Sequence, residues 1–335
     1  MTAASFIDRI SLIIVTWNGD DMLKGCLDSI IKVYGRLPET IVVDNASLAS
    51  TASLVASYAN ATYVPLPENK GFAGGNDAAL PFCTKDYLVL LNNDTQLVAD
   101  SISPLIDFLD HHPQTAAAQG KILLGNETTL DGCGGFFSPL GILAFRGAFV
   151  PDSPEYSKPE RVFAVSGAFF ALRRSVLSHC GGLFHDHFKS YYEEIDLCHR
   201  LALAGYDCWY VPTPAILHKH SATSSKFKRR DIIVQYYSNI WFSFLTCFNA
   251  WNRLRFGLTL ALLCGGHAIV GLFRGNAAPL KAHLSALRNV RANHALICRT
   301  RQVLASLRKR SDREILAYAI RHQPWSYYHM LLKLK

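Results

Sequence analysis

One short apolar stretch that stops at polar residues limits the possible folds of this chain most. Residues 87–91 read Tyr-Leu-Val-Leu-Leu, and Asn92, Asn93 and Asp94 follow directly. A run of this length and composition is typical of a buried strand in a parallel sheet covered on both faces. Such sheets bind ligands at the carboxyl ends of their strands. Asp94, together with diphosphate oxygens, is enough to hold Mg²⁺ or Mn²⁺, although Asn and Asp also favour plain turns.

The first half of the chain alternates between strand and helix patterns. We expect strands at residues 11–16, 41–47, 62–65 and 87–91, and helices at about 20–33, 48–59 and 72–82. Asp20 or Asp21 is a candidate cap for the first helix. Alternation at this short spacing predicts an α/β fold, with a parallel sheet and right-handed crossovers.

Polar residues and glycines also lie at the ends of the other strands. Asp44, beside Thr16, would accept a hydrogen bond from a nucleobase or ribose, or it is an ordinary turn residue. The small residues at 71–75 would let backbone N–H groups approach an anion at a helix start. This stretch is neither G-x-G-x-x-G nor a Walker P-loop, so a plain loop before a helix remains the alternative.

The second half of the chain is less regular. We expect a helix at 101–111 and strands at 116–124, 162–174 and 209–212, the last being the final strand. Gly- and Pro-rich loops at 132–139 and 151–159 are candidates for acceptor recognition. The small Ser166 and Gly167 suggest close approach of a ligand. Glu193, Glu194 and Asp196 begin a helix, where the helix dipole favours acidic residues even without a function.

Four motifs occur in an order that carries a family resemblance. They are Ile-Ile-Val-Thr-Trp-Asn at 13–18, Val-Val-Asp-Asn-Ala-Ser at 42–47, Asn-Lys-Gly-Phe-Ala-Gly-Gly-Asn at 69–76 and Leu-Asn-Asn-Asp at 91–94. This order resembles the nucleotide-binding half of the family 2 inverting glycosyltransferases, most of all their rhamnosyltransferase-like branch. The resemblance implies a GT-A fold, which is Rossmann-like, with a mostly parallel sheet flanked by helices.

The resemblance also implies a metal site. In that family the position of Asp94 belongs to a D-x-D-type motif that binds metal and the diphosphate of a sugar nucleotide. The first acidic position of the motif is Asn92 here, so Mg²⁺ or Mn²⁺ would depend mainly on Asp94. A metal-binding His is implied after an aliphatic pair, which fits His218 best, with His220 as the alternative.

The segment from Tyr191 to Arg200 resembles the catalytic element of the same family. The second acid of its pair, Glu194, is thereby implied to be the general base, with Glu193 placing donor or acceptor and Asp196 bracing the loop or Arg200. Asp131 is a further loop candidate for binding the donor sugar. The residues expected to bind donor or acceptor are Thr16, Asn18, Asp44, Asn45, Lys70, Gly71, Asn76, Asn92, Asn93, Ser166, Gly167, Glu193 and Asp196.

Charge divides the chain into two parts. Residues 1–218 carry 14 Lys and Arg against 23 Asp and Glu, whereas residues 219–335 carry 20 against 3. An acidic body with a basic tail is typical of a protein that docks on an anionic surface. The nine cysteines include no C-x-x-C pair and no secretory signal precedes them, which predicts a reduced, cytoplasmic protein.

The tail is also apolar. Residues 256–273 carry no formal charge but are interrupted by Gly265, Gly266 and His267. Helices are expected at 227–248, 281–291 and 295–310, and we favour helices lying in the interface of an anionic membrane. A true span, or a soluble helical cap that contacts a second copy in a homodimer, remains open. Nucleic acid is the weaker partner because the nearby apolar surface suits lipid better than phosphate backbone.

Together these observations predict a GT-A domain at 1–222 and a helical, membrane-associating extension at 223–335. The nucleotide-binding half would cover about 1–125 and the acceptor half about 126–222. The reaction that the resemblance implies is inverting transfer from a nucleotide sugar, with dTDP-rhamnose as the first donor to consider. The tail and the resemblance together predict a lipid-linked saccharide as acceptor, for cell-surface polysaccharide synthesis at the inner face of the membrane. Two alternatives are a sugar-1-phosphate nucleotidyltransferase and a non-catalytic scaffold. The first would need a Lys or Arg in the loop 17–21, which has none.

Overall fold

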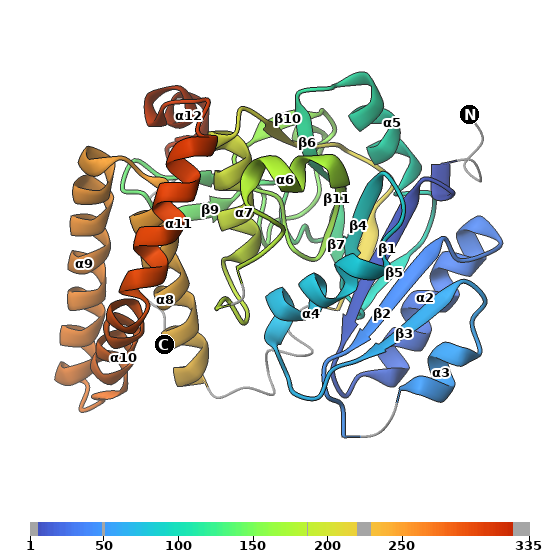
Figure 1. The fold of residues 1–335 in the computed structure, drawn as a ribbon, viewed down its shortest axis with the longest axis horizontal. Helices are drawn as coiled ribbons and strands as arrows, with labels where there is room; N and C mark the ends of the chain where they lie inside the picture. Colours follow the sequence, from blue (N-terminus) through green and yellow to red (C-terminus); the bar gives the residue numbers. More distant parts are fainter. Residues whose placement is uncertain (1–5, 49–50, 186, 220–228, 324–335) are drawn as a thin grey trace.

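The computed structural model describes residues 6–48, 51–185, 187–219 and 229–323. An eight-stranded sheet forms the centre of the molecule, in the order β10-β12-β6-β11-β4-β1-β2-β3 (Figure 1). Its strands are β1 (Ile10–Thr16), β2 (Glu39–Asp44), β3 (Ala61–Pro65), β4 (Tyr87–Leu91), β6 (Thr115–Gln119), β10 (Glu160–Val162), β11 (Phe169–Arg173) and β12 (Asp207–Tyr210). Strands β3, β2, β1 and β4 are parallel neighbours, as are β6 and β12, whereas β11 runs antiparallel between β4 and β6.

The sheet is covered on both faces, because apolar residues alternate between two cores. All five residues of β4 are buried; Leu88 and Leu90 pack into one core, and Val89 and Leu91 into the other. The helices around the sheet are α2 (Asp20–Tyr34), α3 (Ala52–Ala56), α4 (Gly71–Ala79), α5 (Ser103–His111), α6 (Leu177–Cys180) and α7 (Glu193–Leu203). Short 3₁₀ turns lie at Leu80–Phe82, Pro154–Tyr156 and Arg174–Val176. This arrangement confirms the predicted α/β class with flanking helices.

Two smaller sheets lie beside the central one. Strand β13 (Ile216–His218) pairs with β5 (Thr95–Leu97) and with β7 (Ile122–Leu124), while β8 (Gly135–Phe137) pairs with β9 (Leu143–Phe145). In the β5–β13 pairing His218 lies opposite Thr95, and the backbone N–H of Lys219 donates to the carbonyl oxygen of Asp94 at 3.0 Å. This small sheet therefore brings Asp94, just after β4, next to His218 at the end of β13, 124 residues later in the chain.

Several expected elements differ from the structure. The cap of α2 is Gly19, without a side-chain hydrogen bond, and Asp20 and Asp21 lie inside the first turn. The segment 48–59 contains only the short helix α3, and 116–124 divides into β6 and β7. The segment 162–174 also divides, since Ala164 leaves the central sheet to hydrogen-bond with Gly135. Strand β12 is not the last, because β13 follows it.

The C-terminal extension is helical, as its pattern predicted. It consists of α8 (Arg229–Cys247), α9 (Ala250–Phe273), α10 (Ala278–Ala292), α11 (His294–Leu307) and α12 (Asp312–Ala319). Figure 1 shows α9 at the outer edge of the molecule, on the side away from β2 and β3. Within the part of the chain that the structure describes, α9 alone is long and apolar enough to cross a membrane. A third of its most apolar window is buried, so this is weak evidence for a span.

The extension shares a core with the α/β part of the chain. Phe242, Phe248 and Phe256 are buried in the same apolar cluster as Phe163 and Phe137. The ring centroids of Phe137 and Phe163 are 4.4 Å apart, and those of Phe137 and Phe248 are 5.9 Å apart. The boundary at residue 222 stays a prediction, and the described residues before and after it share one apolar core.

Candidate active site

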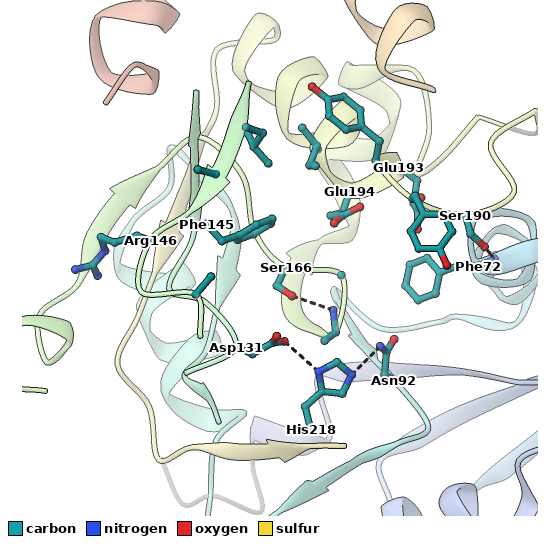
Figure 2. Close-up of a pocket in the computed structure, with 18 of the residues that line it drawn as sticks. Phe72, Asn92, Asp131, Phe145, Arg146, Ser166, Ser190, Glu193, Glu194 and His218 are labelled. Atoms are coloured by element: carbon teal, nitrogen blue, oxygen red, sulfur yellow. Dashed lines mark hydrogen bonds and ion pairs between the residues drawn. The ribbon is translucent and has the colours of Figure 1, made fainter. Parts of the chain in front are cut away.

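A cavity of about 1450 Å³ opens at the carboxyl ends of β1 and β4 (Figure 2). Single small ligands usually occupy roughly 300–1000 Å³, so the cavity has room for a donor and part of an acceptor. Asp94 and Glu194, one hundred positions apart, both line it, as does His218. The expected convergence of these residues on one cleft is confirmed. The other residues of the predicted set that line the cavity are Thr16, Asn45, Gly71, Asn92, Asn93, Ser166, Gly167 and Glu193.

At the ends of β1, β2 and β4, side chains fix the loops that follow the strands. The carboxylate of Asp44 accepts from the backbone N–H of Ser47 at 3.0 Å and from the hydroxyl of Tyr63 at 2.8 Å. Asn93 Nδ2 donates to Thr16 Oγ1 at 2.9 Å. Asp44 does not itself line the cavity, so in this structure its direct role is to hold the turn below the cavity wall.

The loop before α4 is held in a similar way. Asn45 Nδ2 donates to the carbonyl oxygen of Gly71 at 2.9 Å, and the N–H of Lys70 donates to Asn45 Oδ1 at 2.8 Å. Gly71 has φ +72°, and a Cβ there would come within 2.1 Å of the carbonyl oxygen of Lys189. Only glycine fits this close approach. Lys70, Asn18 and Asn76 lie outside the cavity lining, Asn18 and Asn76 being bonded to the backbone of Leu48 and Phe72.

Asp94 and His218 face each other at the floor of the cavity. His218 Nε2 lies 3.2 Å from Asp94 Oδ1 and 3.4 Å from Asn92 Nδ2. Two ligands on neighbouring positions of an octahedral ion, each about 2.1 Å from it, are separated by about 3 Å. The pair therefore fits a divalent ion. No cluster of three or more His, Cys, Asp or Glu with metal-binding geometry occurs among the described residues, so such an ion would need further ligands, as a diphosphate supplies.

Asp131 orients the imidazole of His218. Its Oδ2 lies 3.0 Å from His218 Nδ1, so that Asp131, His218 and Asn92 follow one another in Figure 2. Metal-binding histidines commonly donate their second ring N–H to a carboxylate, which leaves the other nitrogen for the ion. Burial alone would lower the pKa of His218, but the hydrogen bonds and charges of Asp131 and Asp94 raise it to about 9. His220 lies outside the described residues.

The two glutamates at the start of α7 lie across the cavity from His218 (Figure 2). Burial raises the pKa of Glu194 to about 7, although backbone N–H groups of Glu194, Ile195 and Gly167 oppose the shift. Burial and the nearby charge of Glu194 raise the pKa of Glu193 well above its usual range. Among the described residues, Glu193 Oε2 is buried without a hydrogen-bond partner. Both acids of the site thus have a raised pKa, and that of Glu194, about 7, lies near neutral pH.

A strained backbone leads into these glutamates. Tyr191 and Tyr192 both have left-handed conformations, with φ of 71° and 75°. Non-glycine residues in this region cost about 1–3 kcal/mol each and persist where the surroundings hold them, often at functional sites. Helix α8 supplies part of that hold, because Asn239 Nδ2 donates to the carbonyl oxygens of Ser190 at 3.1 Å and Tyr191 at 2.7 Å.

Asp196 lies behind the site and not in it. It is fully buried, and its Oδ2 accepts from Arg200 Nε at 2.7 Å. Arg200 also donates to the carbonyl oxygens of Cys180, Gly182 and Leu183, at 2.6–2.9 Å. Asp196 does not line the cavity, so the structure assigns it the bracing contact with Arg200 and no contact with a substrate in the cavity.

Some cavity residues carried no signal in the sequence. Tyr236 of α8 lines the cavity, and its ring packs edge-on against Tyr192, 6.0 Å between centroids. Arg146, which pairs with Glu160, and Arg321 also line it. These residues come from loops and from the extension, and a single aromatic or basic residue in such a segment is not distinctive without the fold.

Comparison with known proteins agrees with this geometry. Residues 11–181 match the family model described as glycosyl transferase family 2. The chain is 26% identical over 290 residues to "N-acetylglucosaminyl-diphospho-decaprenol L-rhamnosyltransferase" of Mycobacterium tuberculosis (strain CDC 1551 / Oshkosh), which covers 78% of this chain and 93% of the relative.

Two solved structures share the fold. The mannosyltransferase PcManGT from Pyrobaculum calidifontis, in complex with GDP-Man and Mn²⁺, has a TM-score of 0.51 at 18% identity and covers 98% of this chain and 86% of its own. The structure of S. aureus TarS 1-349 has a TM-score of 0.56 at 15% identity, and the match covers 97% of this chain and 90% of the TarS chain. The chain belongs to the family 2 glycosyltransferases, with the GT-A fold of these structures.

Proposed function

We propose that the protein transfers a sugar from a nucleotide-sugar donor to a saccharide hydroxyl with inversion at the anomeric carbon. The observation that carries the proposal is the convergence of Asp94, His218 and Glu194 on one cavity large enough for two substrates. Asp94 and His218 lie at the end where a diphosphate would leave, and Glu194 lies across from them.

The donor would bind along the ends of β1 and β4. Thr16 and Asn45 line this end and are fixed by hydrogen bonds with Asn93 and with the loop at Gly71. Asp94 Oδ1 and His218 Nε2 would hold Mg²⁺ or Mn²⁺, and Asp131 would keep Nε2 turned toward the ion. A bound ion of this kind neutralises charge that develops on a departing diphosphate.

Glu194 would act as the general base. Its carboxylate takes the proton of the acceptor hydroxyl while that oxygen attacks the anomeric carbon and the diphosphate leaves from the other side. This single displacement inverts the anomeric centre. Glu193 lies beside it and would help to place the donor or the acceptor, because its Oε2 is buried without a hydrogen-bond partner among the described residues.

The donor and acceptor are inferred from the relatives. The mycobacterial relative is named a rhamnosyltransferase that acts on an N-acetylglucosaminyl-diphospho-decaprenol, which supports dTDP-rhamnose as the first donor to test and a lipid-linked saccharide as acceptor. An acceptor of this kind would place the reaction at the cytoplasmic face of the membrane. The basic, apolar extension fits that location.

The first experiment identifies the donor. The full-length protein is heated with dTDP-rhamnose, UDP-N-acetylglucosamine or GDP-mannose, each with Mg²⁺, with Mn²⁺ or with a chelator. A ligand that binds only the folded state raises the melting temperature. We expect one nucleotide sugar to do so, and only with the metal. A melting temperature that no nucleotide sugar changes would count against the function and would favour a non-catalytic scaffold.

The second experiment tests the base. In Glu194→Gln we expect transfer from that donor to fall by about 100- to 10,000-fold, the usual contribution of a general base. Donor binding should be unchanged, since the substitution keeps the shape of the side chain. Glu127→Gln, at an exposed loop position, serves as the control. Full turnover in Glu194→Gln would remove Glu194 from this role.

A further inference from the structure

One aromatic side chain of the active-site cavity has no task in the sugar transfer proposed above. Phe145, the last residue of β9, lines the cavity and is partly exposed. Figure 2 shows its ring and the carboxylate of Glu194 turned toward one another across the cavity, whereas the next residue, Arg146, points away. This alternation follows from the strand, in which successive side chains point to opposite faces. An acceptor hydroxyl that gives its proton to Glu194 would therefore belong to a molecule that the ring of Phe145 faces.

The backbone beside Phe145 fixes the position of its ring. The N–H of Cys133 donates to the carbonyl oxygen of Arg146 at 2.7 Å, and the N–H of Arg146 donates to the carbonyl oxygen of Gly134 at 2.8 Å. A Cβ on Gly132 would lie 3.0 Å from the Cβ of Phe145 and 3.5 Å from a carbon of its ring. The ring therefore packs closely against the backbone of Gly132, and its other face is turned to the cavity.

One buried side chain links the wall below this ring to the wall below the proposed base. Gln119, the last residue of β6, is fully buried. Its Nε2 donates to the carbonyl oxygen of Gly132 at 2.6 Å, and its Oε1 accepts from the N–H of Ser166 at 2.8 Å. Gly167 follows, and a Cβ there would lie 3.7 Å from the carboxyl carbon of Glu194. The ring and the base are therefore held at a set separation by backbone and one amide.

The wall around the ring is apolar. On the same segment, Ile142, Leu143 and Phe149 also line the cavity. The charge of Arg146 is balanced by Glu160, whose Oε2 lies 3.0 Å from its Nε. A molecule at this wall would thus be recognised by apolar contact more than by charge. A pyranose sugar offers such a surface, because the C–H groups on one side of its ring are apolar and weakly positive, and the face of an aromatic ring is negative.

We propose that Phe145 is the platform on which the acceptor sugar lies, and that it selects a pyranose with an apolar face. The sugar ring rests on Phe145, and the attacking hydroxyl is turned toward Glu194. The donor reaches that hydroxyl from the side of Asp94 and His218, which line the floor of the same cavity. The inference rests on the proposed transfer and adds the side chain that sets its acceptor preference.

The test measures transfer and donor hydrolysis separately in the full-length protein. The donor is the nucleotide sugar that raises the melting temperature, and the acceptors are the octyl glycosides of N-acetylglucosamine, glucose, galactose and mannose. Without an acceptor, water takes its place, so hydrolysis reports on donor, metal and base without the platform. In Phe145→Ala we expect the KM of the best acceptor to rise by about 10- to 100-fold, the effect of losing an apolar contact of this size. Donor hydrolysis and the KM of the donor should not change.

Two further variants separate a sugar contact from a structural role. Phe145→Tyr keeps the ring face and should restore most of the affinity for the acceptor. Phe82→Ala, the matched control, removes the same side chain from an exposed position outside the cavity and should change neither reaction. Melting temperatures are recorded for all variants, and Phe145→Leu replaces Phe145→Ala if the latter does not fold.

The other outcomes decide against the inference. An acceptor KM that stays unchanged without the ring would overturn it, as would an equal loss of transfer and hydrolysis, which would make Phe145 a structural residue. Wild-type protein that hydrolyses the donor but transfers to none of the octyl glycosides would overturn the platform and leave the donor site standing. Wild-type protein that neither hydrolyses nor transfers would contradict the proposed function itself, and the platform with it.

Discussion

At the scale of single residues, the protonation of Glu194 should control the rate. Its pKa of about 7 lies well above the ordinary value of a glutamate, so in the folded protein it stays protonated under mildly acidic conditions. A protonated carboxyl cannot accept the proton of an acceptor hydroxyl. We therefore expect the transfer rate at saturating donor to rise with pH and to reach half its maximum at about pH 7.

The measurement is the initial rate across the range from about pH 5 to about pH 9, with melting temperatures recorded in parallel to exclude unfolding. Metal binding at His218 also depends on pH, because its pKa is about 9, so the donor and metal are kept saturating throughout. A rate that stays constant from pH 5 to pH 8 would contradict the assignment of Glu194 as base.

A second prediction at this scale concerns Asp131. It does not face the ion directly but contacts His218 Nδ1, so it should act through the orientation of the ring. Replacing the carboxylate in Asp131→Asn should weaken Mn²⁺ binding by about 10- to 100-fold, the usual effect of losing such a partner. Asp152→Asn, in which the lost carboxylate pairs with Lys121, is the matched control.

The readout for Asp131→Asn is calorimetric titration with Mn²⁺ in the presence of the donor nucleotide, followed by turnover at saturating metal. We expect turnover to recover largely when metal is raised, because Asp94 and His218 are still present. If Mn²⁺ binds both variants as tightly as the wild-type protein, His218 is not a ligand of the ion.

At the scale of elements, helix α8 holds the loop before Glu193 in place. Asn239 is 1% exposed and is the residue that bonds Ser190 and Tyr191 from the far side of the loop. In Asn239→Ala the strained tyrosines lose this hold, and Glu194 should move. A displacement of about 1 Å at a reacting group can cost about 100-fold in rate. We expect the turnover number to fall by roughly 10- to 100-fold while the donor dissociation constant stays unchanged.

The control for Asn239→Ala is Asn289→Ala, which removes a contact between α10 and Ser238 of α8 but does not reach the loop. Turnover, donor binding and the melting temperature are measured for both variants, and turnover is compared at a temperature at which both are fully folded. A merely structural role for Asn239 would lower the melting temperature and leave turnover per folded molecule unchanged, and that result would reject the positioning role.

The elements also show what local sequence patterns can predict. Strands β1, β2 and β4 were expected close to their observed positions, since each is a short apolar run that ends in polar residues. The sequence does not predict the break between β10 and β11. It occurs because Ala164 leaves the sheet and hydrogen-bonds with Gly135, 29 residues earlier. A continuous apolar stretch gives no sign of such a distant partner.

The site residues also differ in whether local sequence patterns predict them. Asp94, Glu194 and His218 were identified from motifs, and the cavity brings them together. The residues that hold these three in place are not evident from motifs. Asp131 is predicted to bind the donor sugar, but in the structure it contacts His218. Asn239, which bonds the loop before Glu193, belongs to no motif. These supports depend on contacts across long stretches of chain, which residue type and spacing do not encode.

At the scale of the whole molecule, the extension should be required for folding of the catalytic part. It buries four phenylalanines, Phe242, Phe244, Phe248 and Phe256, in the same cluster as residues of the central sheet. Burial of a side chain of this size contributes about 1.5–3 kcal/mol. Their sum is comparable to the whole stability of a typical domain, about 5–15 kcal/mol. A chain that ends at residue 222 should therefore fail to fold cooperatively.

This prediction separates two views of residues 223–335. If they were an independent membrane anchor, a chain of residues 1–222 would melt cooperatively and would be stabilised by the same nucleotide sugar as the full-length protein. If they complete the core, the shortened chain would show no cooperative melting transition and would bind dyes specific for exposed apolar surface, and detergent would not restore donor binding. We expect the second result, because Phe137 would lose its ring contacts with Phe244, Phe248 and Phe256, and the loop at Tyr191 would lose Asn239. The extension would then serve the active site, because α8 packs against α7, which carries Glu194, and holds the loop before it.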